Sequence, residues 1–415
     1  MRILLFTHYY PPEVNAPASR AHAHCRIWAE LGHDVTVVTC APNHPTGALY
    51  PGYRNRMFQT ATEDGVRVIR IWTYLAANRG FARRTLSYLS YLVSATLALP
   101  FLPKTDIIVS TSPQFFCGLA GFAAKILMRK PWALEIRDIW PESIVTVGAI
   151  RQGLVTRALE RLETMAYRGA DLVAPVTDSF APHIAERRGG PDGICVIKNG
   201  ADLRLFVPHA PDPEFKRRLC GEARFVASYI GTHGMAHGLE TILDAAELLR
   251  DDARILFLLV GDGAERARIE AMRTERGLAN VRVLGQKPKA EMPGIWAATD
   301  VGLILLRRQD AFLKVLPSKM FEAMAMSRPI ILGVGGEARR LLEDARAGLA
   351  ITPESAVELA AAVQRLANDP DLAARLGAQG RAHARAHFDR EVLARRYLEI
   401  LEQTAFRDFE ATRST

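Results

Sequence analysis

The segment KVLPSKMFE, at residues 314–322, carries an unusual set of side chains for its place in the chain. It lies between two apolar runs, VGLILL at 301–306 and PIILGV at 329–334, which are typical of buried strands. Two lysines, a serine and a glutamate therefore occupy a crossover between strands, where the backbone and side chains can meet a ligand. Contact with phosphate would explain these residue types.

The order of residues inside this segment suggests what each would do. Pro317 and Ser318 have the types that begin helices, which places Lys319 in the first helical turn. A lysine opposes the helix dipole there unless an anion is bound nearby. Glu322 follows one turn later, where its carboxylate could accept bonds from two sugar hydroxyls. A solvated helix face is the competing interpretation.

A glycine-rich loop, GTHGMAHG at 231–238, follows one predicted strand and opens a predicted helix. Glycines at 231 and 234 would let the backbone approach an anion, and the amino end of a helix offers free N–H groups. The loop is not a G-x-G-x-x-G motif, so a tight turn without a ligand is an equally good interpretation. GDG at 261–263 is a weaker candidate, which a turn with a capping aspartate would also explain.

Charged residues gather after another predicted strand, in WALEIRDIWPES at 132–143. The ends of parallel strands form ligand sites, so Asp138 is a candidate catalytic or sugar-positioning carboxylate. A structural ion pair between Arg137 and Asp138 is the alternative. The loop after the first strand, residues 7–20, could present His8, Glu13 and Asn15 to the cleft.

Strand-like and helix-like runs alternate along the whole chain, which predicts parallel sheets covered by helices on both faces. At 415 residues the chain is too long for one core. We expect two tandem Rossmann-like, doubly wound α/β domains facing a cleft, at residues 1–205 and 206–385. An amphipathic closing helix at 386–415 is expected to pack back toward the first domain.

The composition indicates some properties of the protein but does not identify its partner. The formal net charge is +8, which suits an anionic partner such as a nucleotide or a membrane surface. Five scattered cysteines form no C-x-x-C pair, so no metal site and no disulfide framework are predicted. The amino-terminal run favours a buried strand over a signal peptide, and a cytoplasmic location is expected.

Residues 79–104 combine arginines with an apolar, aromatic helix pattern. Such a helix can lie in the interface of a membrane, with Arg79, Arg83 and Arg84 near the head groups. A core helix of an α/β domain is the alternative. The most apolar part, 86–102, is too short and too interrupted to span a bilayer.

With these motifs in this order, the chain resembles a GT-B glycosyltransferase of family 4 over essentially its whole length. RDIWPES and LPSKMFEAMAMSRPIILG most resemble the N-acetylfucosaminyl (fucosamine) transferases of bacterial O-antigen and capsule assembly. The resemblance implies a retaining, metal-independent transfer from a nucleotide sugar, with UDP expected, and no separate cofactor. The donor sugar would be an N-acetylated hexosamine or deoxyhexosamine, and the acceptor a saccharide or a lipid-diphosphate-linked saccharide. No nucleic-acid partner is expected. Peripheral binding to the inner membrane leaflet through residues 79–104 is expected.

The resemblance also implies roles for individual residues. Asp138, Lys319 and Glu322 are the expected catalytic set. Glu322 would bind the ribose, with Ser318 and Lys319 beside the phosphates. The full donor-binding set is Gly231, Thr232, Gly234, His237, Gly285, Gln286, Lys287, Lys314, Ser318, Lys319, Glu322, Gly335, Gly336 and Glu337.

The chain departs from the family pattern in three ways. Lys314 stands where a glutamate often contacts the sugar, while Thr232 and His237 stand where the glycine loop often has Arg and Lys. An Arg137-Asp138 pair replaces a common His-Asp pair. Without a metal, cations must stabilise the leaving diphosphate. Lys319 is the expected substitute, with Lys314, Arg307, Arg308, His237 and Arg137 as further cations near the site.

Two rival functions remain open from sequence alone. A nonhydrolysing UDP-GlcNAc 2-epimerase would have the same architecture but no acceptor. A catalytically idle nucleotide-binding scaffold subunit would explain Lys314 and His237. A dehydrogenase is disfavoured because no G-x-G-x-x-G follows the first strand.

Overall fold

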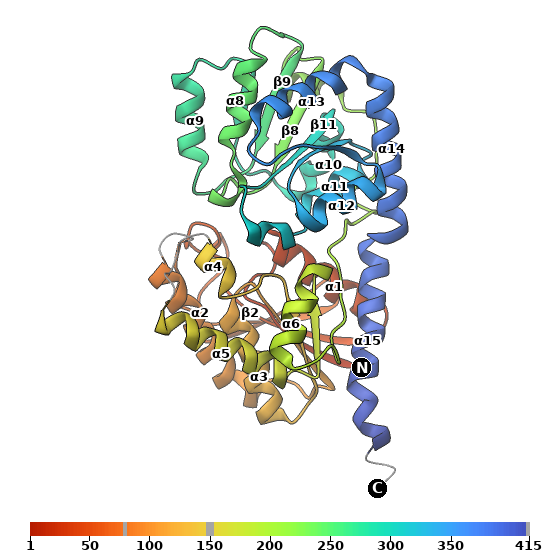
Figure 1. Ribbon diagram of the computed structural model, residues 1–415. Coiled ribbons are helices and arrows are strands. Elements are labelled where there is room, and N and C mark those ends of the chain that lie inside the picture. The colour runs from red at the N-terminus through yellow and green to blue at the C-terminus, as the bar shows by residue number, and fades with distance from the viewer. Residues whose placement is uncertain (78–80, 147–152, 412–415) are drawn as a thin grey trace. The chain divides into compact units, whose positions relative to one another are not determined.

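The computed structural model describes residues 1–77, 81–146 and 153–411, and the chain divides into two compact units. The first unit comprises Met1–Lys198 together with Arg390–Thr415, and the second comprises Asn199–Asp389. These boundaries lie close to those expected near residues 205 and 385. Figure 1 shows that each unit is a sheet with helices packed against it.

The first unit is built on a seven-stranded sheet in the order β3-β4-β2-β1-β5-β6-β7. All neighbouring pairs are parallel except β3 with β4. The strands are β1 (Arg2–Phe6), β2 (Asp34–Cys40), β3 (Phe58–Glu63), β4 (Val66–Ile71), β5 (Ile107–Thr111), β6 (Trp132–Ile136) and β7 (Leu172–Pro175). The helices are α1 (Ala16–Glu30), α2 (Phe81–Ala98), η1 (Leu99–Phe101), α3 (Phe115–Met128), α4 (Glu142–Thr146), α5 (Leu154–Gly169), η2 (Asp178–Phe180), α6 (Ala181–Arg188) and α15 (Arg390–Ala411).

Both faces of this sheet are buried, which explains why its strands are continuous apolar runs. On β1, Ile3 and Leu5 belong to the core that includes residues of α1 and α15. Leu4 and Phe6 belong to the opposite core, which includes residues of α2, α3 and α5. Successive side chains of a strand point to opposite faces, so one short strand supplies both cores.

The second unit is built on a six-stranded parallel sheet in the order β10-β9-β8-β11-β12-β13. The strands are β8 (Phe225–Ile230), β9 (Ile255–Val260), β10 (Val281–Leu284), β11 (Val301–Leu305), β12 (Ile330–Gly333) and β13 (Gly348–Ala350). The helices are α7 (Pro213–Cys220), η3 (Met235–His237), α8 (Glu240–Leu248), α9 (Arg266–Glu275), η4 (Lys289–Glu291), α10 (Met292–Ala297), η5 (Asp310–Lys314), α11 (Lys319–Ala325), α12 (Gly336–Ala345), α13 (Ala356–Asn368) and α14 (Pro370–His387).

The strand orders identify where each unit should hold a ligand. In the first sheet the order reverses between β1 and β5, and in the second between β8 and β11. Ligands of doubly wound sheets bind beyond the carboxyl ends of the strands at such a reversal. The loop that follows β8 is the glycine-rich loop singled out from the sequence, and the loop that follows β1 contains His8.

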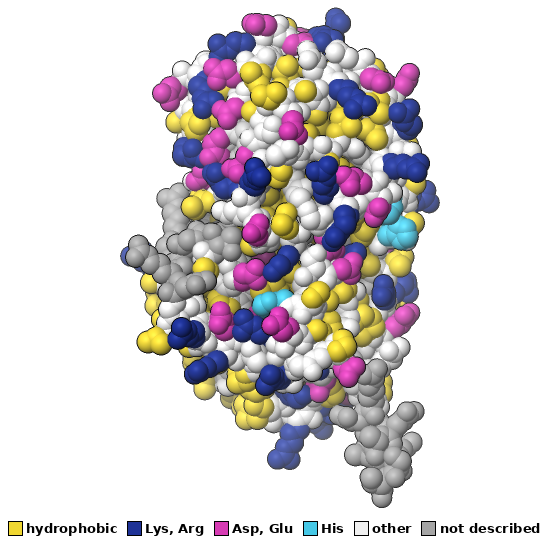
Figure 2. All heavy atoms as spheres, viewed as in Figure 1, with side chains coloured by type: hydrophobic (Ala, Val, Ile, Leu, Met, Phe, Trp, Pro, Cys, Tyr) yellow, Lys and Arg dark blue, Asp and Glu magenta, His cyan; other side chains and the backbone are white. Residues whose placement is uncertain are grey.

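The surface carries charge of both signs. On the face shown in Figure 2, basic and acidic side chains are interspersed on each unit, so the net charge of +8 is not gathered there into one basic patch. Within the described ranges, no helix has the length and apolar character that crossing a membrane requires.

Candidate functional site

The glycine-rich loop makes a sharp departure from β8. Gly231 has φ +148°, a conformation that residues with side chains rarely adopt. A Cβ atom on Gly231 would lie 3.1 Å from Nζ of Lys319. The glycine therefore leaves room for the lysine, which arrives from α11. Of the other predicted loop residues, Thr232 is exposed and Gly234 is partly exposed.

The GDG segment after β9 supports this loop through backbone contacts. A Cβ on Gly261 would lie 1.8 Å from the carbonyl oxygen of Gly231, and one on Gly263 would lie 2.4 Å from that of His233. The backbone N–H of His233 donates to the oxygen of Asp262, and that of Glu265 donates to the oxygen of His233. The glycines of GDG thus permit two loops to pack backbone to backbone. No capping role for Asp262 at α9 is seen.

Lys319 is the unusual group of this site. Its Nζ atom is buried, although the residue as a whole is partly exposed, and it has no hydrogen-bond partner among the described residues. Nζ lies 3.7 Å from the ring centroid of Tyr229, a buried residue of β8. Burial lowers the pKa of Lys319 to about 7, and the nearby carboxylate of Glu322 opposes the shift. The cation–π contact compensates only part of the lost hydration.

The two histidines of the loop are uncharged at neutral pH. Burial, with a smaller contribution from the charge of Lys319, lowers the pKa of His233 to about 4 and that of His237 to about 3. His237 makes a long contact of 3.4 Å from Nδ1 to the oxygen of Leu305. Neither ring nitrogen of His233 has a hydrogen-bond partner in the described part of the chain. The expectation that His237 supplies a cation is therefore not supported.

Glu322 and Ser318 flank Lys319 on the same crossover. Nε1 of the buried Trp296 lies 3.4 Å from Oε2 of Glu322 and donates to it weakly, which orients the carboxylate. Ser318 occupies the N-cap position of α11, but its side chain makes no capping hydrogen bond. The helix start predicted at this point is correct, although the hydroxyl of Ser318 does not cap it.

Lys314 ends η5, one turn of helix that precedes α11. The neighbouring Leu313 packs against the start of α12, where a Cβ on Gly336 would lie 1.9 Å from the Leu313 carbonyl oxygen. Gly336 also has φ +65°, so a glycine is required on two grounds. Gly335 approaches the Leu313 side chain, and Glu337 is buried in the first turn of α12. The two glycines therefore have a packing role besides any contact with the donor.

Three residues of the predicted donor-binding set, Gly285, Gln286 and Lys287, follow β10. Gly285 lies beside the guanidinium of Arg266, which pairs with Asp262 at 3.4 Å. Gln286 is exposed and Lys287 is partly exposed. The backbone N–H of Gly261 donates to the oxygen of Leu284, so the loops after β9 and β10 are neighbours.

Arg307 is already engaged by protein groups. It donates to the oxygen of Met235 at 2.7 Å, to Glu240 at 2.7 Å and to Glu354 at 3.2 Å. The backbone N–H of Arg308 donates to the second oxygen of Glu354. Arg307 thus fixes η3 of the glycine loop rather than offering a spare cation.

In the first unit, Asp138 follows β6 and is partly exposed. Burial of the carboxyl raises its pKa to about 6, and the charge of Arg137 opposes the shift. Arg137 lies 3.8 Å from Glu135, which also accepts from Arg20 at 2.9 Å and from Thr111 at 2.9 Å. The ion pair that orders Arg137 in the structure therefore involves Glu135, not Asp138.

The comparisons with known proteins agree on one family. Residues 15–200 match the glycosyl transferase 4-like domain, and residues 213–383 match glycosyl transferases group 1. The 2-deoxystreptamine glucosyltransferase of Streptomyces kanamyceticus is 30% identical over 281 residues, which cover 65% of this chain and 69% of that protein. The chain belongs to the group 1 glycosyltransferases.

Two further likenesses bear on the fold and the relatives of this glycosyltransferase. A putative colanic acid biosynthesis glycosyl transferase, WcaI of Escherichia coli, is 26% identical over 349 residues, which cover 81% of this chain and 82% of that protein. A crystal structure of HepE from Anabaena in complex with UDP and glucose superposes with a TM-score of 0.70 at 19% identity, covering 97% and 99% of the two chains. The GT-B fold class expected from sequence is confirmed.

The glycosyltransferase site contains residues that sequence analysis missed. Tyr229, whose ring contacts Lys319, belongs to an apolar strand, and nothing in the pattern of that strand marks it as a site residue. Its hydroxyl donates to the oxygen of Thr232 at 2.7 Å. Trp296 was likewise hidden in a short helix. A buried aromatic residue next to a lysine cannot be located until the fold brings separate segments together. The GDG motif at 261–263 did indicate the loop after β9. The alternative interpretation, a turn with a capping aspartate, gave it less weight.

Proposed function

We propose that this glycosyltransferase moves a sugar from a nucleotide-diphosphate sugar, with UDP as the nucleotide, to a saccharide or lipid-linked acceptor with retention of anomeric configuration. The second unit would bind the donor. The observation that carries the proposal is the buried Nζ of Lys319, which has no partner in the described part of the chain and lies beside the open backbone of Gly231. A bound diphosphate would supply the anion that this ammonium group lacks.

Electrostatics explains why a donor phosphate suits this position. The ammonium group has lost hydration, and a phosphate oxygen would restore a charge-assisted hydrogen bond in a site of low dielectric. Loop residues His233 and His237 are neutral, so they can donate or accept without adding charge. Glu322, held by Trp296, would accept from the two ribose hydroxyls.

The proposed reaction needs no covalent intermediate. The bond between the anomeric carbon and the diphosphate oxygen breaks, and its electron pair leaves with the diphosphate. The acceptor oxygen forms its bond to the same face of the anomeric carbon and passes its proton to the leaving phosphate oxygen. Lys319 would stabilise the charge that develops on the diphosphate, in the manner of an oxyanion-hole donor.

The finer assignments follow from resemblances to other glycosyltransferases. Resemblance of RDIWPES and LPSKMFEAMAMSRPIILG to fucosamine transferases favours an N-acetylated hexosamine or deoxyhexosamine donor. A role in surface polysaccharide assembly is supported by the relative named for colanic acid biosynthesis. Metal independence is proposed from the same resemblance, with Lys319 taking the part of a cation.

A membrane-borne acceptor is favoured by the outer face of α2. Leu86, Leu89, Val93 and Leu97 recur at helical spacing and are 38–65% exposed, and Phe101 beyond the helix end is 76% exposed. The inner face of the same helix buries Tyr91, so α2 is both a core helix and an exposed apolar surface. Arg83 and Arg84 lie at its start, while Arg79 falls outside the described residues. We propose that this face contacts the membrane.

Thermal-shift measurements with UDP-, GDP- and dTDP-sugars test the proposed function first, because binding stabilises the folded state by mass action. UDP sugars are expected to raise the midpoint, and the best donor is then incubated with and without lipid-linked saccharides. Transfer with retained configuration, unchanged by a metal chelator, is expected. Conversion of UDP-GlcNAc to UDP-ManNAc without an acceptor would instead indicate an epimerase. Binding of UDP without turnover on any acceptor would indicate an idle subunit.

A further inference from the structure

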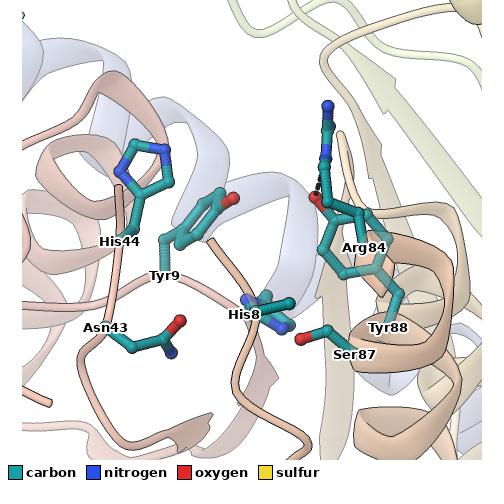
Figure 3. A pocket seen from close by; sticks show the side chains of 8 residues that line it. His8, Tyr9, Asn43, His44, Arg84, Ser87 and Tyr88 are labelled. Carbon is teal, nitrogen blue, oxygen red and sulfur yellow. Dashed lines mark hydrogen bonds between the residues drawn. The ribbon is translucent and has the colours of Figure 1, made fainter. Parts of the chain in front are cut away.

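A small pocket lies in the first unit, beyond the carboxyl ends of β1 and β2. Figure 3 shows side chains converging on it from three places: the loop after β1, the loop after β2 and α2. His8 and Tyr9 come from the first, Asn43 and His44 from the second, and Ser87 and Tyr88 from α2. The space in it that admits a water-sized group is about 20 Å³. That is room for one water-sized group.

His8 leaves a hydrogen-bonding atom unused in this pocket. The residue is 3% exposed, and its Nε2 atom has no partner among the described residues. Nδ1 lies 3.8 Å from Sγ of Cys40. Burial, with a smaller effect of His44, lowers the pKa of His8 to about 3, so the ring is neutral. An unpaired, buried and neutral imidazole nitrogen calls for a group that can donate or accept a hydrogen bond, which a hydroxyl does.

The loop that carries Asn43 and His44 is fixed from beneath. Oε1 of the buried Glu13 accepts from the backbone N–H of both residues at 2.8 Å. The amide nitrogen of Asn43 donates to the oxygen of Ala41. Glu13 is therefore a positioning residue, and Asn43 is held at the pocket in one orientation.

Aromatic rings form the walls. Tyr9 and Tyr88 each stand edge-on to His8, with ring centroids 5.2 Å away, and Tyr9 also contacts His44 at 5.0 Å. The exposed Arg84 donates from Nε to the hydroxyl of Tyr88 at 3.3 Å. Rigid amphipathic rings around one polar recess suit the apolar faces and hydroxyls of a pyranose. The recess itself admits a single hydroxyl or hydroxymethyl arm, and the rest of the ring must stay at the mouth.

We propose that this pocket binds one hydroxyl-bearing arm of the acceptor saccharide, with Nε2 of His8 and the hydroxyl of Ser87 as its hydrogen-bond partners. The inference rests on the proposed transferase function and specifies its acceptor side. The pocket lines the inner side of α2, the helix whose outer side is apolar and exposed. A saccharide carried on a lipid can reach the inner side while its chain stays near the outer one.

Ser87 provides a test that preserves the fold. Its side chain lines the pocket and makes no hydrogen bond to the described residues, so Ser87→Ala removes only the hydroxyl and Ser87→Val fills the space. Ser94→Ala is the matched control, because Ser94 is buried on the same helix but does not line the pocket. Melting temperature and UDP binding check that each variant folds.

Saturation-transfer NMR without donor measures binding directly, with methyl and octyl glycosides of glucose, galactose and N-acetylglucosamine as probes. At least one of these glycosides should bind equally well to the wild type and to Ser94→Ala. It should bind about 3- to 10-fold more weakly to Ser87→Ala and should not bind to Ser87→Val. Tighter binding of octyl than methyl glycosides would identify a lipid-borne source, and equal binding a soluble one.

Two results would overturn the inference. Either no probe binds the wild type, which leaves a pocket for water only, or Ser87→Val binds as the wild type does. Donor binding and UDP release, measured separately, report on the proposed transferase function. A transferase whose acceptor KM is unchanged by Ser87→Val would keep its function and lose this site.

Discussion

The ammonium group of Lys319 lies 3.7 Å from the ring centroid of Tyr229, buried and without a hydrogen-bond partner among the described residues. The contact joins the first residue of α11 to strand β8, and Gly231 makes room for it. A desolvated cation held over an aromatic ring is poised to gain strongly from an incoming anion. The pKa of Lys319, about 7, agrees with this, because the amine is only about half protonated at neutral pH and an incoming anion would favour the protonated form.

Replacing Lys319 by alanine tests its role in leaving-group stabilisation. We expect kcat with the best nucleotide sugar to fall by about 10² or more, as for loss of an oxyanion-hole donor. Lys216→Ala is the control, since Lys216 is a partly exposed lysine of the same unit with a long 4.0 Å contact to Asp300. Turnover near the wild-type value in Lys319→Ala would rule out the assignment.

Binding of UDP should be coupled to proton uptake. At pH 8 free Lys319, with a pKa near 7, is mostly neutral, while the phosphates of UDP, whose last pKa is about 6, are already ionised. A bound diphosphate raises the pKa of the lysine, so the complex should take up close to one proton. Titration calorimetry in buffers of different ionisation enthalpy measures this number. His233 and His237 titrate near pH 4 and 3 and contribute nothing at pH 8.

The matching variant is Lys319→Met, which should bind UDP without proton uptake. The lowered pKa of Lys319 should also make the free energy of unfolding depend on pH. The unfolded lysine, with an ordinary pKa of 10.5, holds a proton that the folded one has lost between pH 7 and 10.5. Stability of the wild type should therefore rise with pH in that window relative to Lys319→Met. Equal proton uptake by both proteins would contradict the proposal.

The fold and part of this site were predictable from sequence because the signals are local. Alternating apolar runs predicted two parallel sheets, and Pro317 with Ser318 predicted where α11 begins. The contact of Lys319 with Tyr229 was not predictable, since it joins segments about 90 residues apart and depends on the strand order. Arg307 was predicted to be a cation available to the ligand. Its contacts with the carboxylates of Glu240 and Glu354 could not be predicted from the sequence.

Gly261→Ala should disrupt the loop that supports the glycine-rich segment. Its new Cβ would lie 1.8 Å from the Gly231 oxygen at φ +149°, and we expect a loss of about 3 kcal/mol or more in the free energy of unfolding. Gly277→Ala is a matched control, because it also has positive φ but meets nothing within 4 Å, and should cost about 1 kcal/mol. Denaturant unfolding measures both. Equal losses would show that the backbone contact contributes little.

Asp138→Asn tests the carboxylate of the first unit. Because the pKa of Asp138 is raised to about 6, an activity that needs its ionised form should fall as pH drops below 6. The variant should turn over about 10- to 100-fold more slowly and lose that acidic limb in kcat/KM. A slow variant that keeps the limb would assign the limb to another group, and full activity would remove Asp138 from the catalytic set.

The outer face of α2 should bind anionic membranes. Leu97→Glu with Phe101→Glu introduces charge where the exposed apolar area is greatest, and sedimentation with vesicles containing anionic lipid should fall at least tenfold. Arg83→Glu should weaken binding further at low salt but little at high salt, because the basic contribution is screened. Val357→Glu, at a 70% exposed position of α13 in the other unit, controls for added charge. If all variants sediment alike, the α2 face is not the membrane contact, and the case for a lipid-linked acceptor loses its structural support.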